Sequence, residues 1–114
     1  MKTVLFFVLI LGMVSCTKKP SSSPEGAQAM TTQQLAERGR VIYVSNCIAC
    51  HHVDPKKVGS VGPEVWGSSL ELIQARVMRA AYPEGYKAKR ETHMMVALPH
   101  LEKELAALHA YLNQ

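Results

Sequence analysis

Apolar residues recur at helical spacing in three segments of the chain, all of them after residue 30. In the first, residues 31–46, Leu35, Gly39, Ile42 and Tyr43 fall on one helical face, and threonines at the start can cap the helix. A glycine inside a helix costs about 1 kcal/mol relative to alanine. Gly39 therefore indicates a close approach by another backbone.

Two more helices are expected. One starts at Ser68, which has capping-box spacing with Glu71, and stops before Tyr82-Pro83, because the residue before a proline disfavours helix. The other covers about residues 101–113. The chain contains no strand pattern, and residues 83–99 have no period, so we predict an all-α domain with long loops. The predicted apolar faces are Leu70, Ile73, Val77 and Ala80 or Ala81 in the second helix, and Leu101, Leu105, Leu108 and Leu112 in the third.

The first 30 residues have a different character. One lysine precedes an apolar run of 11 residues, Val4 to Val14, whereas a spanning helix needs about 20. Residues 1–15 are therefore expected to be a secretory signal. The end of the run resembles a bacterial lipobox, which implies cleavage before Cys16 and lipidation of that cysteine; an ordinary cleaved signal or an uncleaved anchor is the alternative. Residues 16–30, rich in Pro, Ser and Gly, are expected to form a flexible linker to a domain at 31–114.

Length and composition narrow the function. A chain of 114 residues favours one folded domain, and a net charge of +4 without a basic, aromatic-interleaved stripe argues against nucleic-acid binding. Three cysteines leave one unpaired, so a disulfide framework is not expected. A helical domain of this size with long loops buries little apolar surface and needs an additional source of stability.

The motif Cys47-Ile48-Ala49-Cys50-His51 offers that source, because C-x-x-C-H is the attachment signature of c-type haem. Cysteines three apart on a helical turn point to the same side, where they can form thioethers with the two vinyl groups of the haem. His51 then lies under the iron. A thioredoxin-like site would need a βαβ context. A zinc site would need further N or S ligands, which His52 or His93 could supply.

The stretches "GRVIYVSNCIACH", "VGPEVWG" and "MVALPHLEKELAALHAYL" make the chain resemble class I c-type cytochromes over most of residues 33–112. The resemblance implies a small fold of three to four helices around one covalent haem c. It also implies that Gly39 and Tyr43 pack on Leu108 and Tyr111 of the last helix. The site residues that it implies are Cys47, Cys50, His51 as axial iron ligand, Pro63 as the carbonyl partner of His51, and Met95 as distal iron ligand.

The distal ligand leaves alternatives open. The family usually has Met-Pro, whereas this chain has Met95-Val96 with Met94 beside it, and His93 would give a bis-histidine iron instead. Trp66 is expected either in the core or against the haem or its propionates. The remaining candidates are expected to be structural, with Met78 in the core and His52, His100 and His109 at the surface or near helix ends.

A six-coordinate His/Met iron has no open position for a substrate, so we expect an electron carrier rather than an enzyme, with no small-molecule substrate. Its partners would be redox proteins outside the cytoplasm, in the periplasm of a bacterium, with a lipid anchor to the membrane. A haem sensor or the cytochrome subunit of a redox enzyme is the alternative. A copper- or zinc-handling lipoprotein using Cys47, Cys50, His93, Met94 and Met95 is a third hypothesis.

Basic residues cluster on either side of the expected site. Lys56 and Lys57 follow the motif, and Lys87, Lys89 and Arg90 precede the methionines. Such a ring would steer docking onto an acidic surface of a partner. Ordinary solvated loops would show the same composition.

Overall fold

Three α-helices and one 3₁₀ helix form the regular structure of residues 29–114, the part of the chain that the structure, a computed structural model, describes. They are α1 (Thr32–Asn46), α2 (Leu70–Arg79), η1 (Pro99–Glu104) and α3 (Leu105–Leu112). No strand occurs in residues 29–114, which confirms the all-α prediction. The predicted signal sequence, Cys16 and nearly all of the predicted linker lie outside the described residues.

Helix α1 begins where the sequence predicts. The Thr31 hydroxyl accepts a hydrogen bond from the Gln34 backbone N–H at 3.2 Å, and the Gln34 side chain accepts one from the Thr31 N–H at 2.8 Å. This reciprocal pair satisfies two donors that the first turn of a helix leaves without partners. At the other end, the Cys47 N–H donates to the Tyr43 carbonyl, so the helix leads directly into the cysteine motif.

Helix α2 differs from its prediction at both ends. Ser69 is the N-cap, accepting from the Leu72 N–H, because the Ser68 hydroxyl donates to the Val65 carbonyl at 2.6 Å. The predicted capping box of Ser68 is therefore wrong by one residue, and Leu70 is exposed rather than part of the apolar face. The helix ends at Arg79, earlier than predicted, because Ala80 adopts a left-handed conformation with φ 52°.

The last predicted helix is divided in the structure. Pro99 opens η1, and the chain becomes α-helical only at Leu105. The leucine stripe still faces inward, with Leu105 half-buried and the other three buried. The core consists of Tyr43, Ile73, Val77, Leu101, Leu108 and Leu112.

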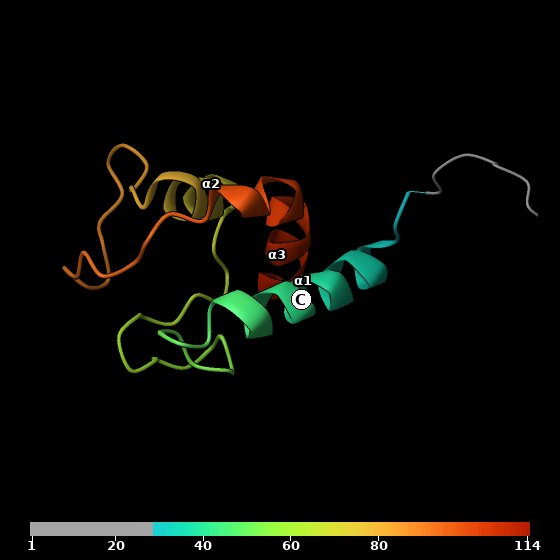
Figure 1. The fold of residues 1–114 in the computed structure, drawn as a ribbon, viewed down its shortest axis with the longest axis horizontal. Coiled ribbons are helices and arrows are strands. Elements are labelled where there is room, and N and C mark those ends of the chain that lie inside the picture. Colours follow the sequence, from blue (N-terminus) through green and yellow to red (C-terminus); the bar gives the residue numbers. More distant parts are fainter. Residues whose placement is uncertain (1–28) are drawn as a thin grey trace, which may run out of the picture.

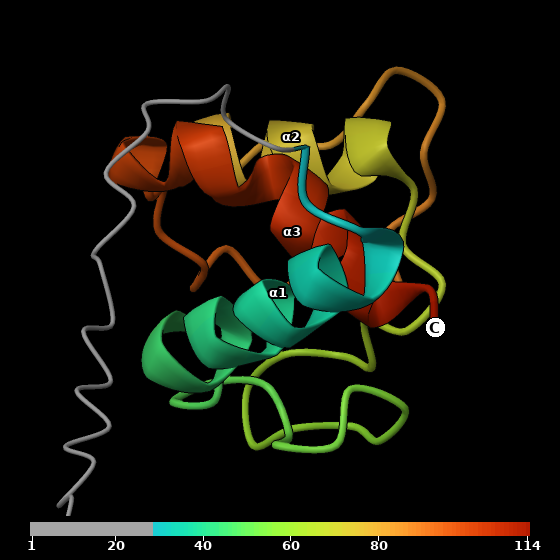
Figure 2. The same ribbon diagram turned by 90° about the vertical axis from the view of Figure 1, so that its right-hand side faces the viewer.

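Helix α3 lies between α1 and α2 and crosses α1 at close range (Figures 1 and 2). A Cβ atom on Gly39 would lie 1.9 Å from the Ala107 carbonyl oxygen, so only glycine permits this approach. One turn further along α1, the Tyr43 and Tyr111 rings meet with centroids 5.5 Å apart. The predicted contact of Gly39 and Tyr43 with the last helix is present, but sequence reasoning missed Ala107 as the point of closest approach.

Two irregular segments complete the described fold. We call residues 47–69 the motif loop and residues 81–98 the strap. Both lie on the left of Figure 1, the motif loop beyond the end of α1 and the strap beside α2, and Figure 2 shows the motif loop below α1. Within residues 29–114, no helix is long and apolar enough to cross a membrane.

The crossing of α1 and α3 gives a stability prediction. Gly39→Ala is expected to lower the free energy of unfolding by about 2 kcal/mol, because the added methyl overpacks against backbone that cannot yield. Guanidinium unfolding of the haem-loaded protein measures the change. Ser45→Ala, at an exposed position on the same helix, is the control and should change stability by only a few tenths of a kcal/mol. Equal or greater stability of Gly39→Ala would contradict the close approach.

Candidate functional site

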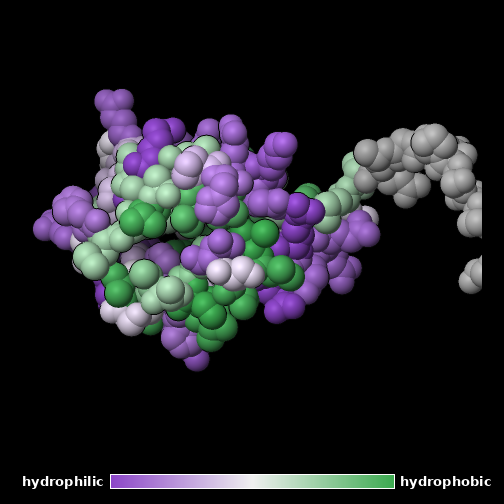
Figure 3. All heavy atoms as spheres, in the orientation of Figure 1, coloured by the Kyte–Doolittle hydropathy of each residue, from purple (hydrophilic) through white to green (hydrophobic). Residues whose placement is uncertain are grey.

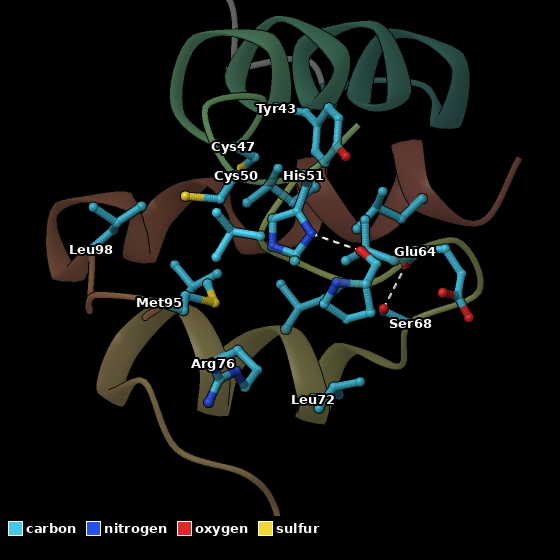
Figure 4. A pocket seen from close by; sticks show the side chains of 18 of the residues that line it. Tyr43, Cys47, Cys50, His51, Glu64, Ser68, Leu72, Arg76, Met95 and Leu98 are labelled. Atoms are coloured by element: carbon cyan, nitrogen blue, oxygen red, sulfur yellow. Dashed lines mark hydrogen bonds between the residues drawn. The ribbon is translucent and has the colours of Figure 1, made fainter. Parts of the chain in front are cut away.

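The motif loop, α2 and the strap enclose an apolar cavity of about 310 Å³. Figure 4 shows the side chains that line it, and Figure 3 shows a hollow on one face of the molecule with hydrophobic residues around much of it. Its size falls within the range of small-molecule and cofactor sites. The motif cysteines, His51 and Met95 all contribute to its wall.

The two cysteines extend the end of α1 by a further helical turn. The N–H groups of Cys50 and His51 both donate to the Cys47 carbonyl, at 3.2 and 2.9 Å. Both thiols are half-buried, and neither forms a disulfide. Burial raises the pKa of the Cys47 thiol to about 11, because the thiolate would lose its hydration there.

His51 is oriented by the backbone of the motif loop. Its Nδ1 lies 2.9 Å from the Pro63 carbonyl oxygen. Because a carbonyl can only accept, Nδ1 carries the proton and the Nε2 lone pair of the neutral ring is free to bind a metal. Sequence reasoning included Pro63 but missed two glycines that let the motif loop pack closely on the cysteine motif. A Cβ atom on Gly62 would lie 2.4 Å from the His51 ring, and one on Gly59 would lie 2.3 Å from the Cys50 carbonyl oxygen.

The strap contributes the methionines, which differ in burial. Both methionines line the cavity. Met95 is half-buried and packs against the core, whereas Met94 is 67% exposed. His93 is exposed and does not line the cavity.

Trp66, expected either in the core or against the haem or its propionates, does not line the cavity. It borders a neighbouring pocket of about 230 Å³, which shares Ser68, Leu72, Tyr86 and Lys89 with the cavity wall. The Lys56 ammonium lies 4.0 Å from the centroid of its ring, as in a cation–π contact. The half-buried indole is therefore covered by a cation and is not part of the described core.

The basic residues expected to form a ring are partly neutralised. Lys57 pairs with Asp54 at 3.7 Å, and Lys89 pairs with Glu64 at 2.9 Å. Lys87 is exposed and has no ion pair in the described part of the chain. The positive field beside the cavity is therefore weaker than a count of basic residues suggests.

The other histidines lie outside the cavity wall. The Nδ1 of His52 accepts from the Asp54 N–H at 2.9 Å, and its carbonyl accepts from the Tyr43 hydroxyl at 2.7 Å. His100 is exposed, and His109 is half-buried on α3.

Two residues that sequence reasoning missed, Arg76 and Tyr82, line the cavity. The Arg76 guanidinium lies 4.2 Å from the centroid of the Tyr82 ring. Leu72 and Arg76 are four residues apart on α2 and therefore lie on the same face of the helix, and this spacing was the sequence signal for Arg76.

These residues fit a covalently attached haem better than a bare metal ion. A metal held by protein alone needs several clustered ligands, and residues 29–114 contain no group of three or more His, Cys, Asp and Glu side chains that could supply them. What the structure provides is an apolar cavity, two free thiols on one turn, and an imidazole with its second nitrogen fixed. The glycines at 59 and 62 leave the room that these groups require.

Comparisons with known proteins agree. Residues 36–114 match the family described as "Cytochrome c". A "Cytochrome c-553-like" protein of Synechocystis sp. is 33% identical over 55 residues, which cover 48% of this chain and 50% of that protein. The chain thus aligns with half the length of this relative. No solved structure matches the chain significantly. With its C-x-x-C-H motif and helical fold, the chain belongs to the cytochrome c family, as a class I c-type cytochrome with covalently bound haem c.

Proposed function

We propose that the protein is a monohaem electron carrier that passes single electrons between redox proteins outside the cytoplasm. The observation that supports this most strongly is the cavity itself, into which His51 and Met95 project from different segments of the chain (Figure 4). When bound, haem c supplies an iron that alternates between two oxidation states. A ligand on each side leaves no open position, so the chain would bind no small-molecule substrate and would not be an enzyme by itself.

Each residue has a distinct role in this proposal. Cys47 and Cys50 hold the cofactor through thioether bonds, one haem per chain. His51 would bind the iron through Nε2, and the Pro63 carbonyl keeps its ring oriented and its Nε2 unprotonated. Met95 would be the second iron ligand, favoured over Met94 by its burial against the core. Methionine ligation raises the reduction potential, as suits a carrier.

The proposed setting is the outer face of a bacterial membrane. Residues 1–15 would be the secretory signal, Cys16 the lipidated residue, and residues 16–30 the flexible linker to the domain at 31–114. A short apolar run after a charged start supports export, and a lipid anchor would keep the domain near membrane-bound redox partners. Mass spectrometry of the mature protein tests this: a diacylated cysteine as the first residue is expected, and an unmodified N-terminus at another position would contradict it.

The spectrum and reduction potential of the haem-loaded protein test the carrier function. A low-spin c-type spectrum with the weak far-red sulfur-to-iron band in the oxidised state is expected, together with no binding of carbon monoxide by the reduced native protein. Rapid carbon monoxide binding would instead indicate an open or labile position, and so a sensor or an enzyme subunit.

The distal ligand gives a sharper prediction. Met95→Ala should abolish the far-red band and lower the reduction potential by about 100 mV or more, within the roughly 800 mV that axial ligands span. Met94→Ala is the matched control and should keep both properties, because Met94 also lines the cavity but is largely exposed and does not pack against the core. The assignment is wrong if Met94→Ala loses the band and Met95→Ala retains it.

Electrostatic docking gives a further prediction. Lys56 and Lys87 have no carboxylate partner in the described residues, so they would carry the attraction for acidic partners. Oxidation of the reduced protein by anionic hexacyanoferrate(III) should slow as salt rises, because screening weakens attraction. Replacing both lysines by alanine should flatten this dependence. A flat profile in the parent protein would remove the steering hypothesis.

A further inference from the structure

The strap is connected to the motif loop by polar contacts from two consecutive residues. Lys89 pairs with the Glu64 carboxylate at 2.9 Å and also reaches the Glu64 carbonyl at 3.3 Å. Arg90 donates from Nη1 to the Val61 carbonyl at 3.0 Å. We call these contacts the latch. They join segments that are 25 and 29 residues apart in the sequence.

The position of the latch relates the two sides of the site. Its acceptors, Val61 and Glu64, flank Gly62 and Pro63, which surround and hydrogen-bond the His51 ring. On the strap, Arg90 precedes Met95 by five residues. The latch therefore fastens the segment that carries the methionine to the segment that orients the histidine.

Apart from the latch, few contacts hold the strap: Met95 and Leu98 pack against the core, and the Leu98 N–H donates to the Val77 carbonyl at 2.7 Å. At its start, the Tyr82 ring lies 4.2 Å from the Arg76 guanidinium and stacks on Tyr86. Residues 87–97 have no regular secondary structure and, apart from the latch, form no side-chain hydrogen bond within the described part of the chain. A segment with few internal contacts opens easily unless something fixes its middle.

The two arms of the latch differ in character. Arg90 is half-buried, and its charge-assisted bond to a backbone carbonyl is shielded from salt. Lys89 and Glu64 are 42% and 38% exposed, so solvent weakens their attraction. The hydrogen bond from Lys89 also holds the pKa of the Glu64 carboxyl below its ordinary value. Arg90 is therefore the stronger arm.

We propose that Arg90, assisted by Lys89, is a positioning residue that keeps Met95 in the cavity by fastening the strap to the motif loop. This inference rests on the proposed role of Met95 as distal ligand. Without the latch, the strap would open more often and carry Met95 out of the cavity, although residue 95 itself is unchanged. The competing account is that packing of Met95 and Leu98 against the core holds the strap alone.

The rate at which imidazole replaces the distal ligand in the oxidised, haem-loaded protein tests the latch. Imidazole binds only after the methionine has left, and loss of the far-red band follows the exchange. Arg90→Ala should bind imidazole about tenfold faster, which corresponds to about 1.4 kcal/mol. Lys89→Ala should increase the rate about threefold at low salt and less at high salt.

Lys87→Ala is the matched control, because Lys87 is an exposed cation on the same strap without a partner in the described structure. It should leave the rate unchanged. Amide hydrogen exchange of residues 91–97 provides a second readout of strap opening and should be faster in Arg90→Ala than in Lys87→Ala. If Arg90→Ala matches the parent in both measurements while the parent shows the far-red band, the latch is overturned and the proposed function stands. A parent protein without that band would instead contradict the proposed function.

Discussion

The contact between Gly39 of α1 and the backbone at Ala107 of α3 is the constraint on which the rest of the structure depends. It fixes the angle at which the two helices cross, and α1 ends in the cysteine motif while α3 continues η1 and, before it, the strap. This crossing therefore places the two cysteines and His51 on one side of the cavity. Met95 reaches the cavity from the strap, which precedes η1 and α3 in the chain. Bringing the helices closer is impossible, and any larger side chain at position 39 would push them apart.

Most residues of the hydrophobic core also line the candidate site. Tyr43, Ile73, Val77, Leu108 and Leu112 belong to the core and also line the cavity. For a domain this small, apolar burial by the chain alone gives a marginal core. A covalently held cofactor would complete it, so folding and cofactor attachment are expected to be coupled. No charged or polar residue is fully buried in the described part of the chain, and Arg76, which lines the cavity, is only half-buried and lies against the Tyr82 ring.

Local features of this fold could be predicted from the sequence, as the extent of α1 and the cysteine turn show. Of the contacts between distant segments, those that the family resemblance implies could be predicted, such as the crossing of α1 and α3 at Gly39 and the hydrogen bond between Pro63 and His51. The N-cap of α2 was misplaced because Ser68 and Ser69 can both cap, and only the competing bond to Val65 decides between them. The contacts of Trp66 with Lys56 and of the latch lie in the motif loop and the strap. Neither segment has a hydrophobic period from which its contacts could be predicted.

The attachment of the cofactor is the central claim, and extraction tests it most directly. The domain from Thr31 to Gln114 would be produced in a host with haem-attachment machinery and treated with acidified acetone, which extracts haem that is not covalently bound. The mass of the treated chain would then be measured by mass spectrometry. The account predicts that one haem stays on the chain through the treatment, and that replacing Cys47 and Cys50 together by serine leaves none. A protein that folds without haem, or one from which the haem is extracted, would contradict it.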